Sequence, residues 1–180
     1  MTPSDLSARL LVVSGNIVEQ DVDAIVNAAN TSLLGGGGVD GAIHRAAGPE
    51  LLEACRAIGG CPTGEARITP GFRLKARHVI HTVGPVWSGG ARRERELLAS
   101  AYERSLDLAT SNGLRTLAFP SISTGAYRFP MDEAARNALE TTALWLSANE
   151  LPGIVTFVCF GDESRAVHEA ARTNLLSTET

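Results

Sequence analysis

Short apolar runs rich in β-branched residues alternate with amphipathic segments of helix length along this 180-residue chain. Several of the runs are apolar on both faces, which is typical of strands buried between two layers of helices. They lie at residues 10–13, 24–26, 66–69, 78–83, 116–119 and 154–160. Apolar residues recur at helical spacing within residues 97–109, 134–146 and 167–175, and Asn112-Gly113 marks the end of the first of these helices. The alternation predicts a three-layer α/β/α domain whose ligands bind beyond the carboxyl ends of the strands.

The size and charge of the chain limit its function. A length of 180 residues favours a single domain over residues 1–180. The net charge of −4 argues against bulk nucleic-acid binding but allows a local positive pocket for one small anion. No signal peptide is expected from the first residues, and the apolar stretch 155–160 is too short to cross a bilayer. The odd number of cysteines favours a cytoplasmic protein over one built on disulfides. Cys55 and Cys61 lack the spacing of zinc ligands, so no metal is expected, and no contact with a membrane is expected either.

Two glycine-rich loops each follow a predicted strand and precede a helix-like segment. The first glycine loop spans residues 27–41 and contains the run Gly35 to Gly38, and the second glycine loop spans residues 119–127. Main chain without side chains can approach a phosphate closely, and a helix N-terminus offers free N–H groups and a partial positive charge. Two such loops at one edge of a sheet can hold both phosphates of a diphosphate.

The glycines also have other interpretations. A flexible surface loop is the plain alternative, although slack between a buried strand and a helix costs conformational entropy without apparent return. A Walker-type phosphate loop is excluded because no Gly-Lys-Ser/Thr follows. The dinucleotide-binding fingerprint fits poorly, because its spacing is absent and no acidic ribose ligand ends the next strand.

A carboxylate, Asp40, directly follows the first run of glycines. Its plain alternative is an acidic residue that complements the dipole of a first helical turn. His44 lies four residues later, so on a helix it shares a face with Asp40 and can hydrogen-bond to it, or it is a half-buried surface histidine. Asn30 can simply end the preceding strand. His78 and His81 are three residues apart in a strand, so they point to opposite sides and cannot form a site together.

Five motifs, in order along the chain, carry a resemblance that one glycine cluster alone would not. They are GNI at 15–17, DAIVNAAN at 23–30, GGGGVDGAI followed by HRAAG at 35–48, HTVGP at 81–85 and PSISTG at 120–125. Together they resemble a macrodomain, and more narrowly the MacroD-type branch that includes bacterial O-acetyl-ADP-ribose deacetylases. The resemblance covers residues 11–163. It implies a mixed, mostly parallel central sheet of about six strands and a bound ADP-ribose.

The resemblance also implies where the adenine lies. Its contacts fall on Asn16 and Ile17, after the first strand, and on Phe160, at the end of the last strand. Asn16 is a departure, because the family uses an acidic side chain to accept from the exocyclic amine, and a neutral acceptor forms a weaker hydrogen bond. Phe160 has a plain alternative as a core phenylalanine.

The diphosphate and the distal ribose are placed by the same resemblance. Asn30 matches the asparagine that contacts the ribose hydroxyls, and Tyr127 should lie against that ribose. Main-chain N–H groups of the two glycine loops embrace the diphosphate. The residues that match are Gly37, Gly38, Val39 and Asp40 in the first glycine loop, and Ser123, Thr124, Gly125, Ala126 and Tyr127 in the second.

The resemblance implies an ester hydrolase with Asp40, Asn30 and His44 as its catalytic residues. The scissile bond is an acyl ester on the distal ribose, in O-acetyl-ADP-ribose or at a mono-ADP-ribosylated Asp or Glu of a protein. Asp40 can activate the attacking water, or it can orient the substrate while a diphosphate-bound water attacks. His44 would hold the carboxylate, and Asn30 would fix the sugar. We expect no cofactor, and a monomer whose partners are ADP-ribose, its esters and mono-ADP-ribosylated proteins.

Two other functions fit the same phosphate-binding loops. One is a reader module that binds ADP-ribose without changing it, and the other is a phosphatase that acts on ADP-ribose 1″-phosphate. A pure binder needs none of Asn30, Asp40 and His44, so this trio favours the hydrolase.

Overall fold

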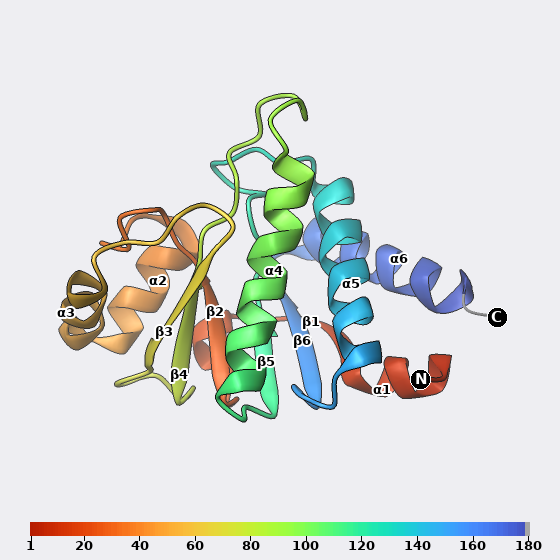
Figure 1. Cartoon of the computed structure of the whole chain (residues 1–180), viewed down its shortest axis with the longest axis horizontal. Coiled ribbons are helices and arrows are strands. Elements are labelled where there is room, and N and C mark those ends of the chain that lie inside the picture. The colour runs from red at the N-terminus through yellow and green to blue at the C-terminus, as the bar shows by residue number, and fades with distance from the viewer. Residues whose placement is uncertain (179–180) are drawn as a thin grey trace.

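One six-stranded sheet forms the centre of the structure, a computed structural model that describes residues 1–178 (Figure 1). Its strand order is β1-β6-β5-β2-β4-β3, and every neighbouring pair is parallel except β3 with β4. The strands are β1 (Leu10–Ser14), β2 (Ala24–Ala28), β3 (Ala66–Pro70), β4 (His78–Thr82), β5 (Thr116–Phe119) and β6 (Ile154–Cys159). The mixed, mostly parallel sheet is the one that the family resemblance implied.

Helices cover both faces of the sheet. They are α1 (Pro3–Arg9), the 3-10 helix η1 (Ile17–Glu19), α2 (Gly38–Ala47), α3 (Pro49–Ile58), α4 (Glu94–Ser111), α5 (Met131–Ala148) and α6 (Asp162–Thr178). Successive residues of β2 enter different cores: Val26 belongs to the apolar cluster that contains Tyr102 of α4, and Ile25 to the cluster that contains Leu51 of α3. Strands apolar on both faces therefore lie between two helix layers, and the predicted α/β/α architecture is confirmed.

The carboxyl ends of five parallel strands share one edge of the sheet. β2 lies between β5 and β4, and it pairs in parallel with both. The first glycine loop follows β2, and the second glycine loop follows β5. The strand order thus brings two loops about ninety residues apart in the sequence to neighbouring positions, as ligand binding beyond the strand ends requires.

Two α-helices, α1 and α3, and the 3-10 helix η1 were not predicted from the sequence, although both α-helices carry start signals. α1 begins with a capping box, in which Asp5 N–H donates to Thr2 Oγ1 at 3.1 Å and Thr2 N–H donates to the Asp5 carboxylate at 2.9 Å. α3 has Pro49 in its first turn. The end of α4 is as predicted, with Asn112 as C-cap and Gly113 at φ 68°.

Strands β4 and β6 end at Thr82 and Cys159, one residue earlier than predicted, which leaves Phe160 outside the sheet. Within residues 1–178, no helix combines the length and the apolar character needed to span a bilayer. The prediction of one domain over residues 1–180 extends past the described residues and stays a prediction.

Candidate functional site

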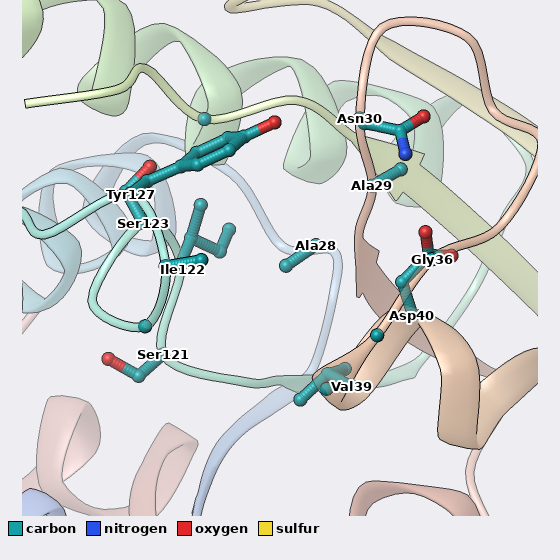
Figure 2. A pocket seen from close by; sticks show the side chains of 15 residues that line it. Ala28, Ala29, Asn30, Gly36, Val39, Asp40, Ser121, Ile122, Ser123 and Tyr127 are labelled. Atoms are coloured by element: carbon teal, nitrogen blue, oxygen red, sulfur yellow. The ribbon is translucent and has the colours of Figure 1, made fainter.

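A cavity of about 350 Å³ lies at the carboxyl edge of the sheet, beyond the ends of β2, β4 and β5. The first glycine loop and the start of α2 form one side, and the second glycine loop forms the other (Figure 2). The predicted site residues that line it are Asn30, Gly37, Gly38, Val39, Asp40, Ser123, Gly125, Ala126 and Tyr127. It is also lined by Ala28, Ala29, Gly36, Gly84, Ser121 and Ile122, which the sequence analysis did not assign.

The helix α2 begins directly at the cavity. Its N-cap, Gly37, provides no side-chain acceptor for the N–H groups of the first turn. These N–H groups are therefore available to an anion, with the positive end of the helix dipole behind them. Gly38 has φ 57°, a conformation that favours glycine. Gly41 allows the turn to pack on the loop, since a Cβ there would lie 2.5 Å from the Gly36 carbonyl oxygen.

The second glycine loop is folded back on itself. Phe129 N–H donates to the Ser123 carbonyl at 2.9 Å, and Ser123 adopts a left-handed conformation with φ 66°. Backbone strain of this kind concentrates at ligand sites. Gly84, just after β4, lets the loop pack against the strand, because a Cβ there would overlap the Ser123 hydroxyl and lie 2.6 Å from Ile122 Cγ2. The cavity therefore has main chain in close approach on both sides.

The two carboxylate oxygens of Asp40 face opposite ways, one into the protein interior and the other towards the cavity. The residue is only 5% exposed, and its Oδ1 accepts a hydrogen bond from Asn27 Nδ2 at 2.9 Å. Its Oδ2 lies towards the cavity, since a Cβ added to Gly36 would be 3.3 Å from Oδ2 and 3.6 Å from Asn30 Nδ2. Figure 2 shows the carboxylate pointing towards Gly36 and Asn30. One oxygen is thus held from the protein interior while the other is beside the lining.

Buried polar side chains that the sequence analysis did not identify continue inward from Asp40. Asn27 and His81 are register partners on β2 and β4, with Asn27 Nδ2 3.2 Å from His81 Nδ1. His81 Nε2 lies 3.0 Å from Thr69 Oγ1. Burial, assisted by the nearby His44, lowers the pKa of His81 to about 3, so the imidazole is neutral near pH 7.

Cysteine chemistry does not fit the site. Cys55 Sγ is 3.8 Å from His81 Nε2, but burial, with a smaller effect of Asp40, raises the pKa of this thiol to about 11. A thiol of that pKa is hardly ionised near neutral pH and is a poor nucleophile. Among residues 1–178, no three His, Cys, Asp or Glu side chains are grouped so that they could hold a metal ion.

His44 shares the helix face of Asp40 as predicted, but the predicted hydrogen bond between them is not formed. His44 Nε2 lies 3.4 Å from Asp40 Oδ1, within ion-pair range, and has no hydrogen-bond partner among the described residues. The structure thus has a close polar contact between His44 and Asp40 in place of a hydrogen bond, and the catalytic role of His44 stays a prediction. The hydrogen bond to Asp40 Oδ1 comes from Asn27, because β2 places the amide beneath the start of α2.

Asn30 lines the cavity, and its amide also shapes the first glycine loop. Nδ2 donates to the Gly35 carbonyl at 2.9 Å, while Oδ1 accepts from Ser32 Oγ at 2.6 Å and from Leu33 N–H at 3.1 Å. These bonds use one of the two Nδ2 hydrogens and both lone pairs of Oδ1. In this arrangement Asn30 has a single N–H left to offer a ligand.

The family model for the Macro domain matches residues 26–138 of this chain. The chain belongs to the macro domain family. A Salmonella newport (strain SL254) protein named O-acetyl-ADP-ribose deacetylase is 53% identical over 167 residues, which cover 91% of this chain and 93% of that protein. The Oceanobacillus iheyensis macrodomain with ADP superimposes with a TM-score of 0.92 at 44% identity, over 96% of this chain and 95% of that one. The Trypanosoma brucei macrodomain in complex with ADP-ribose superimposes with a TM-score of 0.85 at 44% identity, over 90% of this chain and 68% of that one.

The residues predicted to contact adenine lie outside the cavity of this macro domain, at the same edge of its sheet. The parallel pairing of β1 with β6 places Ser14 beside Cys159, and Gly15 N–H donates to the Cys159 carbonyl at 3.1 Å. Asn16 and Phe160 each come shortly after these strand ends. Since β6 pairs with β5, these residues lie two or three strands from β2, in the direction in which a long ligand could extend.

Each predicted adenine contact has its own surroundings. Asn16 is exposed and is the N-cap of η1, where its Oδ1 accepts from Val18 N–H at 3.2 Å. Ile17 is buried in the apolar cluster on the α2 and α3 face of the sheet. Phe160 is 88% exposed, so its alternative role as a core phenylalanine is wrong: β6 has ended before this residue.

A third loop, residues 83–93 of the macro domain, supports Tyr127. Trp87 N–H donates to the Tyr127 carbonyl at 2.8 Å, and the Trp87 ring packs on Phe129 with centroids 4.7 Å apart. The buried carboxylate of Glu94 accepts from three main-chain N–H groups of this loop, those of Ser88, Gly90 and Arg92. Burial alone would raise the pKa of Glu94, but the main-chain N–H of Glu94 itself, together with these three, holds the pKa below its usual value.

Thr124 is the one predicted member of the second glycine loop that does not line the cavity. Its Oγ1 lies 2.7 Å from Ser121 Oγ, so the two hydroxyls bond to each other within the loop. The glycine of the motif HTVGP is Gly84, so a steric role at this position could have been inferred from the sequence. The burial of Asn27 and its link to His81 had no local signal, because the two residues meet only across paired strands.

Proposed function

We propose that this macro domain is a hydrolase that binds ADP-ribose and cleaves ester-linked ADP-ribose. Its substrates are O-acetyl-ADP-ribose and proteins that carry mono-ADP-ribose on Asp or Glu. The observation that carries the proposal is the position of Asp40, which lies in the first turn of α2, inside the main-chain cavity, with one oxygen fixed from behind. A reader module needs the main-chain cavity but has no use for a buried, anchored carboxylate.

The cavity suits a diphosphate. The uncapped start of α2 faces the second glycine loop across a space of about 350 Å³, so N–H groups can approach the phosphates from both sides. The adenosine end would extend along the sheet edge towards Asn16 and Phe160, and the distal ribose would lie near Asn30, Asp40 and Tyr127. The relatives solved with ADP and with ADP-ribose support this choice of ligand.

The chemistry is attack of water on the ester carbonyl carbon. A bond forms between the water oxygen and the acyl carbon, the bond from that carbon to the ribose oxygen breaks, and a proton passes to the ribose oxygen. Asp40 Oδ2 is the acceptor that activates or positions the water. The hydroxyls of Ser121 and Thr124 are poor candidates for a nucleophile, because they bond to each other. The deacetylase name of the Salmonella relative supports an ester substrate.

Replacement of Asp40 tests the proposal. The protein is incubated with O-acetyl-ADP-ribose and, separately, with an Asp/Glu-linked ADP-ribosylated protein, and released ADP-ribose is measured by mass spectrometry. Asp40→Ala should lower kcat by at least about 100-fold, while the ADP-ribose Kd from calorimetry stays within about tenfold, because the phosphates bind to main chain. Asp40→Asn, which keeps the shape but not the charge, should also be inactive.

Two outcomes would contradict the proposal in different ways. A wild-type protein that binds ADP-ribose but releases no product from either substrate would be a reader module. An Asp40→Ala variant with near wild-type turnover would leave hydrolysis in place but remove Asp40 from its mechanism.

A further inference from the structure

The interior polar chain behind Asp40 is not explained by packing. Asn27 is completely buried in β2, next to the apolar residues Ala24, Ile25 and Val26. Its Oδ1 has no hydrogen-bond partner among the described residues. A buried amide with an unpaired acceptor destabilises a fold relative to an apolar residue of similar size. The feature of Asn27 that an apolar residue could not replace is therefore its pair of Nδ2 hydrogens.

The orientation of the Asn27 amide follows from its neighbours. Nδ2 is 2.9 Å from Asp40 Oδ1 and 3.2 Å from His81 Nδ1. A carboxylate oxygen can only accept, so a reversed amide would place two acceptors against each other. With Nδ2 in this place, its two hydrogens serve Asp40 and His81. His81 Nδ1 must then be the acceptor.

The tautomer of His81 follows in turn. An imidazole that accepts at Nδ1 carries its proton at Nε2, and this N–H points to Thr69 Oγ1 at 3.0 Å. The low pKa that burial gives His81 agrees with a neutral ring. Four side chains from α2, β2, β4 and β3 therefore form one chain of hydrogen bonds, in which Asn27 donates both to Asp40 and to His81, and His81 donates to Thr69.

We propose that Asn27 and His81 are positioning residues for Asp40: the neutral His81, protonated at Nε2, orients the Asn27 amide, and the amide holds Asp40 Oδ1 so that Oδ2 faces the cavity. This inference rests on the proposed hydrolase function. Neither residue lines the cavity, so both act through Asp40. A small rotation of Asp40 would move Oδ2 away from the water that it serves, and displacements of about 1 Å can lower a rate about 100-fold.

The decisive variant is Asn27→Asp, which keeps the shape and replaces the amide donor by a carboxyl group. At pH 7.5 its kcat should fall about 100-fold, while the ADP-ribose Kd and KM change less than about threefold. As the pH is lowered, the ratio of variant to wild-type kcat should rise, because a proton shared by residues 27 and 40 restores the hydrogen bond. The other titratable groups near this pair are His44 from α2, Cys55 from α3, His81 from β4 and Tyr127 across the cavity.

Two further variants separate positioning from packing. His81→Asn supplies a carbonyl oxygen that can accept from Asn27, whereas His81→Leu has a similar size and no acceptor. At comparable thermal stability, His81→Asn should retain at least about tenfold more kcat than His81→Leu. Thr82→Val is the matched control, since Thr82 is the next residue of β4 and its buried hydroxyl donates to the Glu65 and Ala101 carbonyls, away from Asp40. Its kcat should equal that of the wild type.

A measurement without substrate tests the chain itself. ¹⁵N NMR of the imidazole should report the Nε2–H tautomer of His81 from pH 8 to pH 5, and it applies even if Asn27→Asp does not fold. An Nδ1–H tautomer, a protonated ring, or a folded Asn27→Asp variant with kcat within threefold of wild type would overturn the inference. A wild type that hydrolyses neither ester would contradict the proposed function, and the tautomer would still decide whether the chain exists.

Discussion

Gly84 follows β4 and lies beneath the second glycine loop, where only a hydrogen atom fits. A Cβ at this position would overlap the Ser123 hydroxyl and lie 2.6 Å from Ile122 Cγ2. The position does not require a left-handed conformation, so the constraint is space alone. At the scale of single residues, the site depends as much on glycine positions where no side chain fits as on the carboxylate of Asp40.

Gly84→Ala should therefore weaken ADP-ribose binding without unfolding the protein. The added methyl group displaces the second glycine loop, and the loss of well-aligned main-chain donors should raise Kd by about tenfold, or about 1.4 kcal/mol. Calorimetry with ADP-ribose measures this. Gly153→Ala is the matched control, because it lies before β6 and its Cβ would meet only the Arg115 carbonyl oxygen, at 3.4 Å. Equal affinities in the two variants would refute the steric role of Gly84.

At the scale of elements, the short helix α1 is held in place by arginines. Arg9 donates to five main-chain carbonyls between the end of α5 and the start of β6, those of Leu146, Asn149, Glu150, Pro152 and Gly153. Arg172 of α6 donates to the carbonyls of Leu10 and Ser7. A helix of this length is not stable on its own, so these bonds and the burial of Leu6 determine that it forms.

Arg9→Lys should lower the free energy of unfolding by about 2 kcal/mol, because an ammonium group cannot reach the same set of carbonyls as the planar guanidinium. Urea denaturation measures the change. Arg93→Lys, at an exposed position that forms an ion pair with Glu96, serves as control and should be nearly neutral. The affinity for ADP-ribose should be unaffected in both variants. A neutral Arg9→Lys would show that α1 is held by burial alone.

For the whole molecule, two buried histidines make stability depend on pH. Burial lowers the pKa of His81 to about 3 and also lowers that of His168, against the opposing effect of its hydrogen bond to Ser164. Both pKa values are below the unfolded value of 6.5. Below pH 6.5 these two histidines bind protons in the unfolded chain but not in the native state. Their contribution to the free energy of unfolding is therefore fully present above pH 6.5 and is lost as the pH decreases towards the folded pKa.

Denaturant titrations at pH 7.5, 6.0 and 5.0 should show this loss. The free energy of unfolding should fall by about 1.4 kcal/mol per pH unit for each histidine that stays neutral in the native state. The His81→Asn variant should show a shallower dependence than the wild type, because one of the two groups is gone. A stability that is constant from pH 7.5 to pH 5.0 would show that His81 titrates normally.

Much of the fold could be predicted because its signals are local. Strand runs such as 116–119 and the stop at Asn112-Gly113 follow from side-chain preference and backbone conformation within a few residues. The glycine loops were recognisable because phosphate approach demands bare main chain. Asp40 could be singled out because it follows such a loop at a helix start. The capping box at Thr2 is an equally local signal for α1.

Local sequence signals were enough to predict most strands and helices, the two main-chain loops and the single carboxylate beside them. What holds that carboxylate depends on the tertiary structure. His44 was the natural candidate from helical spacing, whereas Asn27 and His81, 54 residues apart, meet because β2 pairs with β4 in one register. Likewise, the exposure of Phe160 depends on where β6 ends against its neighbours. Spacing along the chain fixes local geometry, but strand order and register are properties of the assembled sheet, and they choose the partners of every buried polar group.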